Sequence, residues 1–209
     1  MGGSGDIHVA GTGSFALEVA EYARDAGLEV AGLIELQDPA RVGTEVHGLA
    51  VRAADDPPAD GAAAVVGAGG DRLAHWALLA SHGWRAASVL HPAAHVAPSA
   101  RVGDGCVVAP GVVVGAATEL GEHVLLGRGA LVGHHTALGT GVVLNPGANV
   151  AGHVRLGVGV TVGMGALVAD HLEVGDGAVI AAGAVVVRPV AAGVRVQGVP
   201  ARPYGGGGG

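Results

Sequence analysis

Residues 120–138 read LGEHVL-LGRGAL-VGHHTA-L, three successive groups of six residues that each begin with Leu or Val. The same column continues in both directions, and every sixth residue from Leu90 to Val186 is Val, Leu or Ile. Neither an α-helix, with its period of 3.6, nor an ordinary strand, with its period of 2, needs such a repeat. A hexad repeat is typical of a parallel β-helix, in which each side of a triangular coil contributes one short strand. The sequence therefore predicts a β-helix over residues 91–204, with three hexads in each coil.

The other columns of the hexad predict where side chains point, counting the aliphatic residue as position one. Position four contains Gly, four His and one Ala, which indicates a left-handed backbone conformation in which Gly is unstrained and His is tolerated. Position five is small or aliphatic, so it is expected to face inward together with position one. Position three is chemically mixed and is expected to face outward; it includes His134. Hexad β-helices are left-handed, and we expect that hand here.

The composition restricts the function classes. The chain has 209 residues, half of them hydrophobic, but only one Phe, two Tyr and two Trp, so its core must be aliphatic. A net charge of −7 argues against non-specific nucleic-acid binding. The single cysteine excludes an internal disulfide, and we find neither a leader nor a membrane span, so we expect a cytoplasmic protein. The closing glycines 205–209 are interpreted as a flexible tail.

Residues 1–90 follow a different pattern. Strands are expected at 7–10, 28–34 and 62–66, and helices at 14–26 and 71–82. This alternation predicts an α/β domain with a small Rossmann-like parallel sheet. Residues 1–90 would then be a nucleotide- or nucleotide-sugar-binding domain, followed by the β-helix.

A glycine loop supports that prediction. Gly11-x-Gly13-x-x-Ala16 lies between a predicted strand and a predicted helix, as in phosphate-binding loops, and Glu35 follows at the distance expected of a ribose-binding acid. The alternative is a tight turn without a ligand. NAD is a further option, but the domain is about half a full dinucleotide fold. A mononucleotide or a nucleotide-sugar diphosphate fits it better.

Histidines provide the second group of candidates. An outward imidazole at His134 can act as a general base near neutral pH, whereas the alternative is a surface histidine on a turn. His135 belongs to the Gly/His column and can be a turn residue. His135, His153 and His171 are spaced 18 residues apart and are expected to stack on successive coils. Three ligands in a line make a poor tetrahedral site, so no metal is expected.

Several stretches resemble the sialic-acid O-acetyltransferase-like sugar acyltransferases, a hexapeptide-repeat family that includes nucleotide-linked amino-sugar N-acetyltransferases of the bacillosamine and perosamine pathways. The matching stretches are Gly11-Thr-Gly13, Gly67-Ala-Gly-Gly-Asp71-Arg72, Leu90-His-Pro-Ala-Ala-His-Val-Ala-Pro98, Gly129-Ala-Leu-Val-Gly-His134, Asn149-Val-Ala-Gly152 and Gly198-Val-Pro-Ala-Arg202.

The resemblance implies an acetyl-CoA-dependent N-acetyltransferase that acts on the amino group of a nucleotide-linked 4-amino-deoxy sugar. It implies direct transfer and a homotrimer with active sites between subunits. His134 falls on the family's base, and the candidate catalytic residues are His134 and His135. The nucleotide would contact Gly11, Gly13, Ser14, Phe15, Glu35, Ala68 and Gly69. Acetyl-CoA would contact Val143, Gly152, Met164 and Ala182.

The sequence departs from the family at one informative point. The family usually has an acidic residue directly after the base, where this chain has His135. Two other functions stay open at this stage. One is O-acetylation of a sialic-acid-like sugar, and the other is a non-catalytic or metal-binding hexapeptide protein similar to γ-carbonic anhydrases.

Overall fold

The computed structural model describes residues 6–57 and 62–204. The predicted glycine tail at 205–209 lies outside these residues. The chain divides into two compact units, Met1–Pro92 with Asp104–Val107, and Ala93–Gly103 with Val108–Gly209. No helix in the described part of the chain is both long and apolar enough to cross a bilayer.

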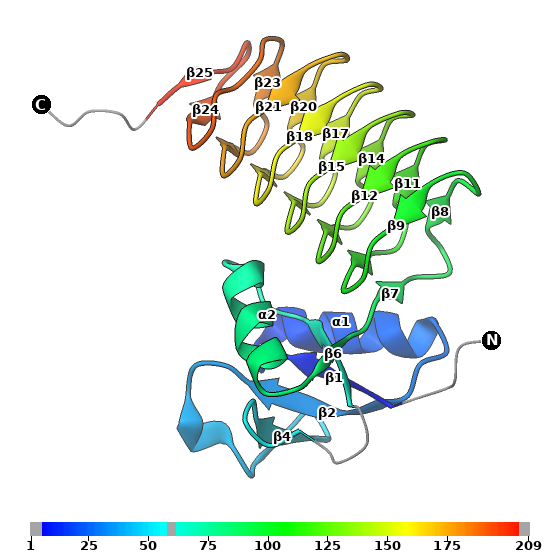
Figure 1. Cartoon of the computed structure of the whole chain (residues 1–209), viewed down its shortest axis with the longest axis vertical. Helices are drawn as coiled ribbons and strands as arrows, with labels where there is room; N and C mark the ends of the chain where they lie inside the picture. Colours follow the sequence, from blue (N-terminus) through cyan, green and yellow to red (C-terminus); the bar gives the residue numbers. More distant parts are fainter. Residues whose placement is uncertain (1–5, 58–61, 205–209) are drawn as a thin grey trace, which may run out of the picture. The chain divides into compact units, whose positions relative to one another are not determined.

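The first unit contains a small mixed sheet with β1 (Ile7–Ala10) near its centre (Figure 1). The strand order is β3-β4-β2-β1-β5-β6, and all neighbours are parallel except the β3–β4 hairpin. The remaining elements are β2 (Val30–Glu35), β3 (Glu45–Val46), β4 (Leu49–Ala53), β5 (Ala63–Val66), β6 (Arg85–Ala86), β7 (Val89–Leu90), α1 (Ser14–Asp25), α2 (Arg72–Ser81) and the 3-10 turn η1 (Pro39–Arg41). The expected strands and helices are therefore present, with ends shifted by one or two residues.

Aliphatic side chains hold this sheet together, as the composition requires. Val9, Leu33 and Ile34 are almost completely buried. Helix α1 contributes a small-residue face, of which Ala16 and Val19 are fully buried. Small residues on that face let the helix lie close to the sheet, which fixes the loop between β1 and α1.

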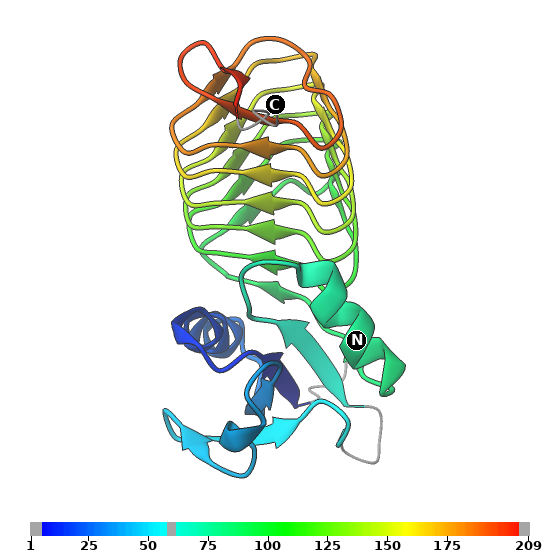
Figure 2. The same cartoon turned by 90° about the vertical axis from the view of Figure 1, so that its left-hand side faces the viewer.

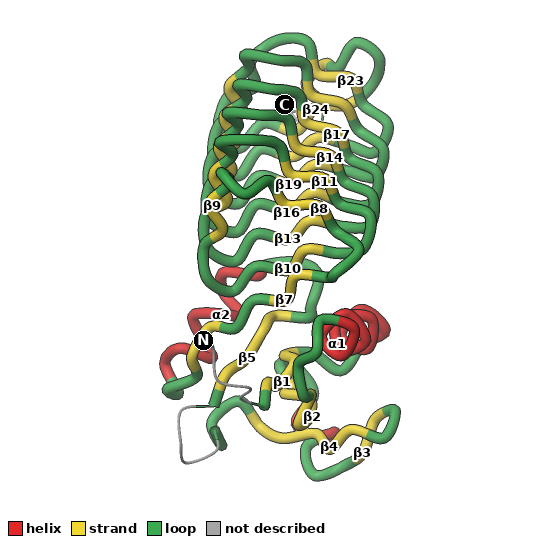
Figure 3. Tube along the Cα trace, turned by 90° about the vertical axis from the view of Figure 1, so that its right-hand side faces the viewer, coloured by secondary structure: helices red, strands yellow, loops and turns green. Residues whose placement is uncertain are grey.

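The second unit is a β-solenoid whose strands stack coil on coil (Figures 2 and 3). The strands are parallel and two residues long, except that β24 has three residues and pairs antiparallel with β25. One sheet contains β8 (His95–Val96), β11 (Val113–Val114), β14 (Leu131–Val132), β17 (Asn149–Val150), β20 (Leu167–Val168) and β23 (Val185–Val186). A second contains β9 (Arg101–Val102), β12 (Glu119–Leu120), β15 (Ala137–Leu138), β18 (Arg155–Leu156) and β21 (Glu173–Val174). A third contains β10 (Val107–Val108), β13 (Leu125–Leu126), β16 (Val143–Leu144), β19 (Thr161–Val162), β22 (Val179–Ile180), β24 (Arg195–Gln197) and β25 (Arg202–Pro203).

The register of these strands confirms the hexad prediction. Leu131 pairs with Asn149, and Asn149 pairs with Leu167, so each residue faces the residue 18 positions later. From residue 106 to 166, all position-five side chains are at most 1% exposed; they are Cys106, Val112, Thr118, Val124, Ala130, Thr136, Val142, Ala148, Val154, Val160 and Ala166. The position-four residues have positive φ, including Ala117, His123, His135, His153 and His171.

The glycines at position two have a different cause. Gly121 does not adopt a left-handed φ, but a Cβ built on it would lie 2.7 Å from the backbone nitrogen of Thr140 on the next coil. Gly115 likewise lies against the backbone nitrogen of His134, at 2.7 Å from an added Cβ. Close approach of successive coils, and not turn conformation, therefore explains this column.

The two glycine columns should respond differently to substitution. We expect Gly121→Ala to lower the free energy of unfolding by about 1–3 kcal/mol, because the methyl group overlaps the next coil. Gly159→Asn should cost less than about 1 kcal/mol, because Asn tolerates the left-handed conformation and Gly159 has open space around its Cβ direction. Denaturant unfolding at one protein concentration measures both. Equal losses would contradict the assignment.

Candidate functional site

One cavity lies where three neighbouring parallel strands of the first unit end. The carboxyl ends of β1, β2 and β5 meet there, at the kind of position where open α/β sheets bind ligands. The cavity has a volume of about 440 Å³ and is lined by Gly11, Thr12, Gly13, Ser14, Phe15, Glu35, Leu36, Gln37, Asp38, Arg41, Gly67, Ala68 and Gly69. All seven residues that the sequence analysis assigned to the nucleotide are in this lining.

The glycine loop is built for close backbone packing. Gly11 has φ +122°, and a Cβ there would lie 3.2 Å from the carbonyl oxygen of Gly67. Its N–H donates to the carbonyl of Ile34 at 2.8 Å, which ties the end of β1 to β2. Gly13 follows as the N-cap of α1, with nothing within 4 Å of its Cβ direction. The loop can therefore bring backbone N–H groups up to an anion.

Glu35 has a structural task inside the cavity. Its Oε1 accepts hydrogen bonds from the backbone N–H groups of Leu36, Gln37 and Asp38, at 2.9, 2.8 and 3.0 Å. Its Oε2 accepts one from the hydroxyl of Thr12 at 2.6 Å. Burial alone would raise the pKa of Glu35, but these four hydrogen bonds outweigh it and lower the pKa. Much of the carboxylate therefore holds the loop that follows β2, at residues 36–38. The position of Glu35 at the end of a strand does not by itself predict this role.

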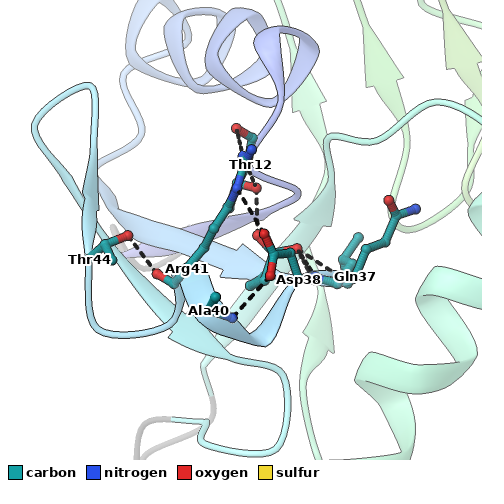
Figure 4. A network of polar contacts seen from close by, with 8 residues as sticks. Thr12, Gln37, Asp38, Ala40, Arg41 and Thr44 are labelled. Atoms are coloured by element: carbon teal, nitrogen blue, oxygen red, sulfur yellow. Dashed lines mark hydrogen bonds and ion pairs between the residues drawn. The ribbon is translucent and has the colours of Figure 1, made fainter.

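Two arginines were not predicted as nucleotide contacts: Arg41 lines this cavity, and Arg72 is bound to the end of β5 next to it. Arg41, from η1, reaches over the loop and donates from Nη1 to Oγ1 of Thr12 at 3.1 Å (Figure 4). Arg72 is 2% exposed and donates to the carbonyl of Val66 at 2.8 Å, directly before Gly67. Burial lowers the pKa of Arg72 to about 10. The Asp71-Arg72 pair at a helix start was visible in the sequence, but nothing in it signals a buried guanidinium.

Glu35 gives a test of this loop. We expect Glu35→Gln to lower the free energy of unfolding by about 1–3 kcal/mol at pH 7, because charge-assisted hydrogen bonds are lost. Since folding lowers the pKa of Glu35, its contribution is complete above the ordinary carboxyl pKa and is lost as pH falls through the folded-state value. The difference from wild type should therefore shrink in thermal melts towards pH 3.

Glu45→Gln on exposed strand β3 is the control for that experiment. Glu35→Gln melting like Glu45→Gln at pH 7 would show that the carboxylate does not hold the loop.

In the second unit, His134 lies at the corner of the coil between β14 and β15. A Cβ built on Gly152 would lie 3.0 Å from Cε1 and 3.1 Å from Nε2 of His134, so the imidazole covers the Gly152 backbone on the next coil. Nδ1 of His134 lies 3.1 Å from Nδ1 of His135. Both side chains belong to exposed residues. The structure therefore brings together three of the predicted residues, His134, His135 and Gly152.

The predicted histidine ladder is present. The rings of His135 and His153 stack with centroids 5.0 Å apart, and those of His153 and His171 with centroids 4.7 Å apart. His134 meets His153 edge-on, at 5.1 Å. Desolvation and the neighbouring His171, His135 and His134 lower the pKa of His153, against an opposing effect of Asp170. The hydrogen bond to Nδ1 of His171, at 2.9 Å, lowers the pKa of Asp170.

The other predicted acetyl-CoA residues lie elsewhere on the coil. Met164 and Ala182, 18 residues apart, occupy the corner between β19 and β20 and its equivalent one coil later; Met164 is 60% exposed. Val143 is on β16, in the third sheet. A cavity of about 1,000 Å³ runs along the β9–β21 sheet and has none of these residues in its lining. This cavity is a broad hollow over a sheet face, and His134 is not in its lining. The corner at His134 is therefore the candidate site for the chemistry.

Comparisons with known proteins identify the family. No protein-family model and no curated protein sequence matches the chain. Among solved structures, a His-to-Asn variant of perosamine N-acetyltransferase from Caulobacter crescentus, in complex with CoA and GDP-perosamine, is 32% identical over 96% of this chain and 97% of its own, with a TM-score of 0.88. The acetyltransferase domain of PglB from Neisseria gonorrhoeae, in complex with acetyl coenzyme A, is 31% identical over 96% and 100%, with a TM-score of 0.86.

WeeI from Acinetobacter baumannii is 25% identical over 95% of this chain and 99% of its own, with a TM-score of 0.86. Similarity at this level over nearly the whole length confirms the resemblance drawn from the hexads and glycine motifs. The chain belongs to the hexapeptide-repeat family of sugar N-acetyltransferases that includes the perosamine enzyme and the PglB domain.

Proposed function

We propose that this protein transfers the acetyl group of acetyl-CoA to the amino group of a nucleotide-linked amino-deoxy sugar. The observation that carries the proposal is the outward imidazole of His134 over Gly152, in a chain 32% identical to an enzyme solved with CoA and GDP-perosamine. The cavity at the ends of β1, β2 and β5 supports it, because a diphosphate is the ligand that a glycine loop before a helix accepts. We assign a Rossmann-like nucleotide-binding role to the first unit on that basis.

In the proposed reaction, Nε2 of His134 accepts a proton from the sugar amine as the nitrogen attacks the thioester carbonyl carbon. The tetrahedral intermediate collapses with cleavage of the C–S bond. The leaving CoA thiolate takes up the proton from the imidazolium of His134, which restores the neutral base. No covalent acyl-enzyme is needed, and Cys106, the free cysteine of this chain, is buried.

His135 replaces the acidic partner of the base. Two Nδ1 atoms 3.1 Å apart share one hydrogen. The productive arrangement has the hydrogen on His134, which donates it to a neutral His135 and keeps the Nε2 lone pair of His134 free for the substrate. His135 is thus proposed as a positioning residue that selects the tautomer of His134.

The ligand contacts follow the same division. We propose Gly11, Gly13, Ser14, Phe15, Glu35, Ala68 and Gly69 for the nucleotide, with Thr12 and Arg41 added from the cavity. For acetyl-CoA we propose Val143, Gly152, Met164 and Ala182, with Gly152 nearest the acyl group because it lies against His134. Both substrates and the buried free thiol of Cys106 favour work in the cytoplasm. We also propose the left-handed coil that uninterrupted hexads favour.

A thiol-release assay with acetyl-CoA and a panel of UDP-, GDP- and TDP-linked amino sugars tests the proposal. We expect turnover with an amino sugar and none with the same sugar carrying a 4-hydroxyl group. The hydroxyl sugar is included because it tests O-acetylation, the alternative reaction. His134→Asn should lower kcat by at least about 10² because the general base is lost. His135→Asn should lower it less, because an amide can still accept the Nδ1 hydrogen.

The controls for that assay keep its outcomes separate. Unchanged CoA binding by His134→Asn, measured by calorimetry, shows that the site is intact. Wild-type turnover in that variant would exclude His134 as the base, and transfer only to a hydroxyl group would replace the proposed reaction.

We further propose a homotrimer whose interface includes the β8–β23 sheet. Val113, Leu131 and Leu167 are 42%, 41% and 43% exposed, and they stack at equivalent positions of that sheet. Exposed apolar residues that gather on one face mark association surfaces; in this ladder Asn149 lies between Leu131 and Leu167. His134 follows Leu131 by three residues, so a subunit docked on this face would border the base.

Leu131→Glu should therefore break the trimer, because three charges would be buried at the interface. Light scattering coupled to size-exclusion chromatography should report three chains for wild type and fewer for the variant, with a matching loss of turnover. Arg155→Glu on the β9–β21 sheet is the matched control and should stay trimeric. A trimeric Leu131→Glu variant would move the interface to another face.

A further inference from the structure

Three imidazoles converge at the His134 corner. One ring nitrogen from each of His134, His135 and His153 lies within 4.8 Å of the others, and all three residues are exposed. They come from two adjacent coils, at a corner and not along one strand. This cluster is distinct from the in-line ladder of His135, His153 and His171, with which it shares His135 and His153.

The His134 ring approaches the other two rings from the side, which distinguishes the cluster from a simple stack of imidazoles. His135 and His153 stack at an interplanar angle of 14°, so their ring faces are parallel. His134 stands at 87° to both rings, which brings its nitrogen in from a different direction. Ligands that approach from different directions satisfy tetrahedral coordination, whereas three stacked rings do not.

The three donor nitrogens determine which metal ions suit the site. Three neutral imidazoles and no carboxylate within the cluster are suited to Zn²⁺, Cu²⁺ or Ni²⁺ and not to Mg²⁺ or Ca²⁺. Tetrahedral Zn–N bonds of about 2.0–2.1 Å place ligand nitrogens about 3.3 Å apart. His134 and His135 already meet that spacing at 3.1 Å. Rotation of the exposed His153 side chain is the remaining adjustment.

We propose that His134, His135 and His153 form a site for a divalent transition metal, specifically Zn²⁺. The bound ion inhibits the enzyme. A neutral imidazole has one basic lone pair. When His134 binds a metal through either nitrogen, the other nitrogen carries the hydrogen and cannot accept a proton from an amine. The inhibition rests on the proposed function, whereas the metal site itself does not.

Metal binding is measured without substrate, on chelator-treated full-length protein that has no histidine tag. Titration calorimetry with ZnCl₂ should give one ion per chain. Co²⁺ substitution should give the intense visible absorption of tetrahedral coordination. His153→Asn should weaken binding by at least about tenfold through loss of one ligand, and Asn keeps the left-handed corner that His153 occupies at φ +59°.

His171→Asn is the matched control, because it lies in the same column one coil later and stacks on His153 without belonging to the cluster. It should change affinity by less than about threefold. Zinc should also inhibit turnover reversibly, at a concentration that rises at least tenfold in His153→Asn. Equal zinc affinity of wild type and His153→Asn, or equal losses in both variants, would overturn the site. An inactive protein that still binds zinc in this pattern would contradict only the proposed function.

Discussion

Hydrogen bonding between strands whose paired residues lie 18 positions apart is the constraint on which the β-solenoid depends. Leu131 donates to the carbonyl of Ala148 and Gly133 to that of Val150, at 2.9 and 2.8 Å, and similar pairs repeat along the described coils. Strands of two residues are too short to be stable alone, so each coil needs its neighbours. The repeat also forces chemically equivalent positions to lie on top of one another, which converts a sequence spacing into a spatial contact.

Stacking at such short range decides which residues are allowed. Where the next coil approaches a corner, only a residue without Cβ fits, as at Gly115 below the His134 backbone. Where the chain turns with positive φ, Gly is replaced by His at four corners of the solenoid: His123, His135, His153 and His171. The second rule therefore places an imidazole ladder beside His134. Gly152, at position three, follows neither rule: an added Cβ there would lie 3.0 Å from Cε1 of the His134 ring.

The sequence was sufficient wherever the repeat determines position. The inward columns, the positive-φ corners and the stacking of His135 on His153 all follow from counting in sixes. The sequence was insufficient where the hydrogen-bond partners of a side chain do not depend on the repeat. Glu35 was expected as a ribose contact, yet it accepts three backbone hydrogen bonds and one from Thr12. Arg41 has no motif of its own, and its place over the glycine loop depends on the path of η1.

The residue beside His134, the proposed base, has consequences beyond orientation. A carboxylate beside His134 would accept its hydrogen and add a fixed negative charge, so that only one tautomer is possible. An imidazole at residue 135 can accept or donate, so the tautomer of His134 depends on the protonation of its neighbour. The same replacement supplies a second nitrogen 3.1 Å from the first, next to a third on His153. The residue type at position 135 thus couples the proposed proton transfer at this corner to the proposed metal site.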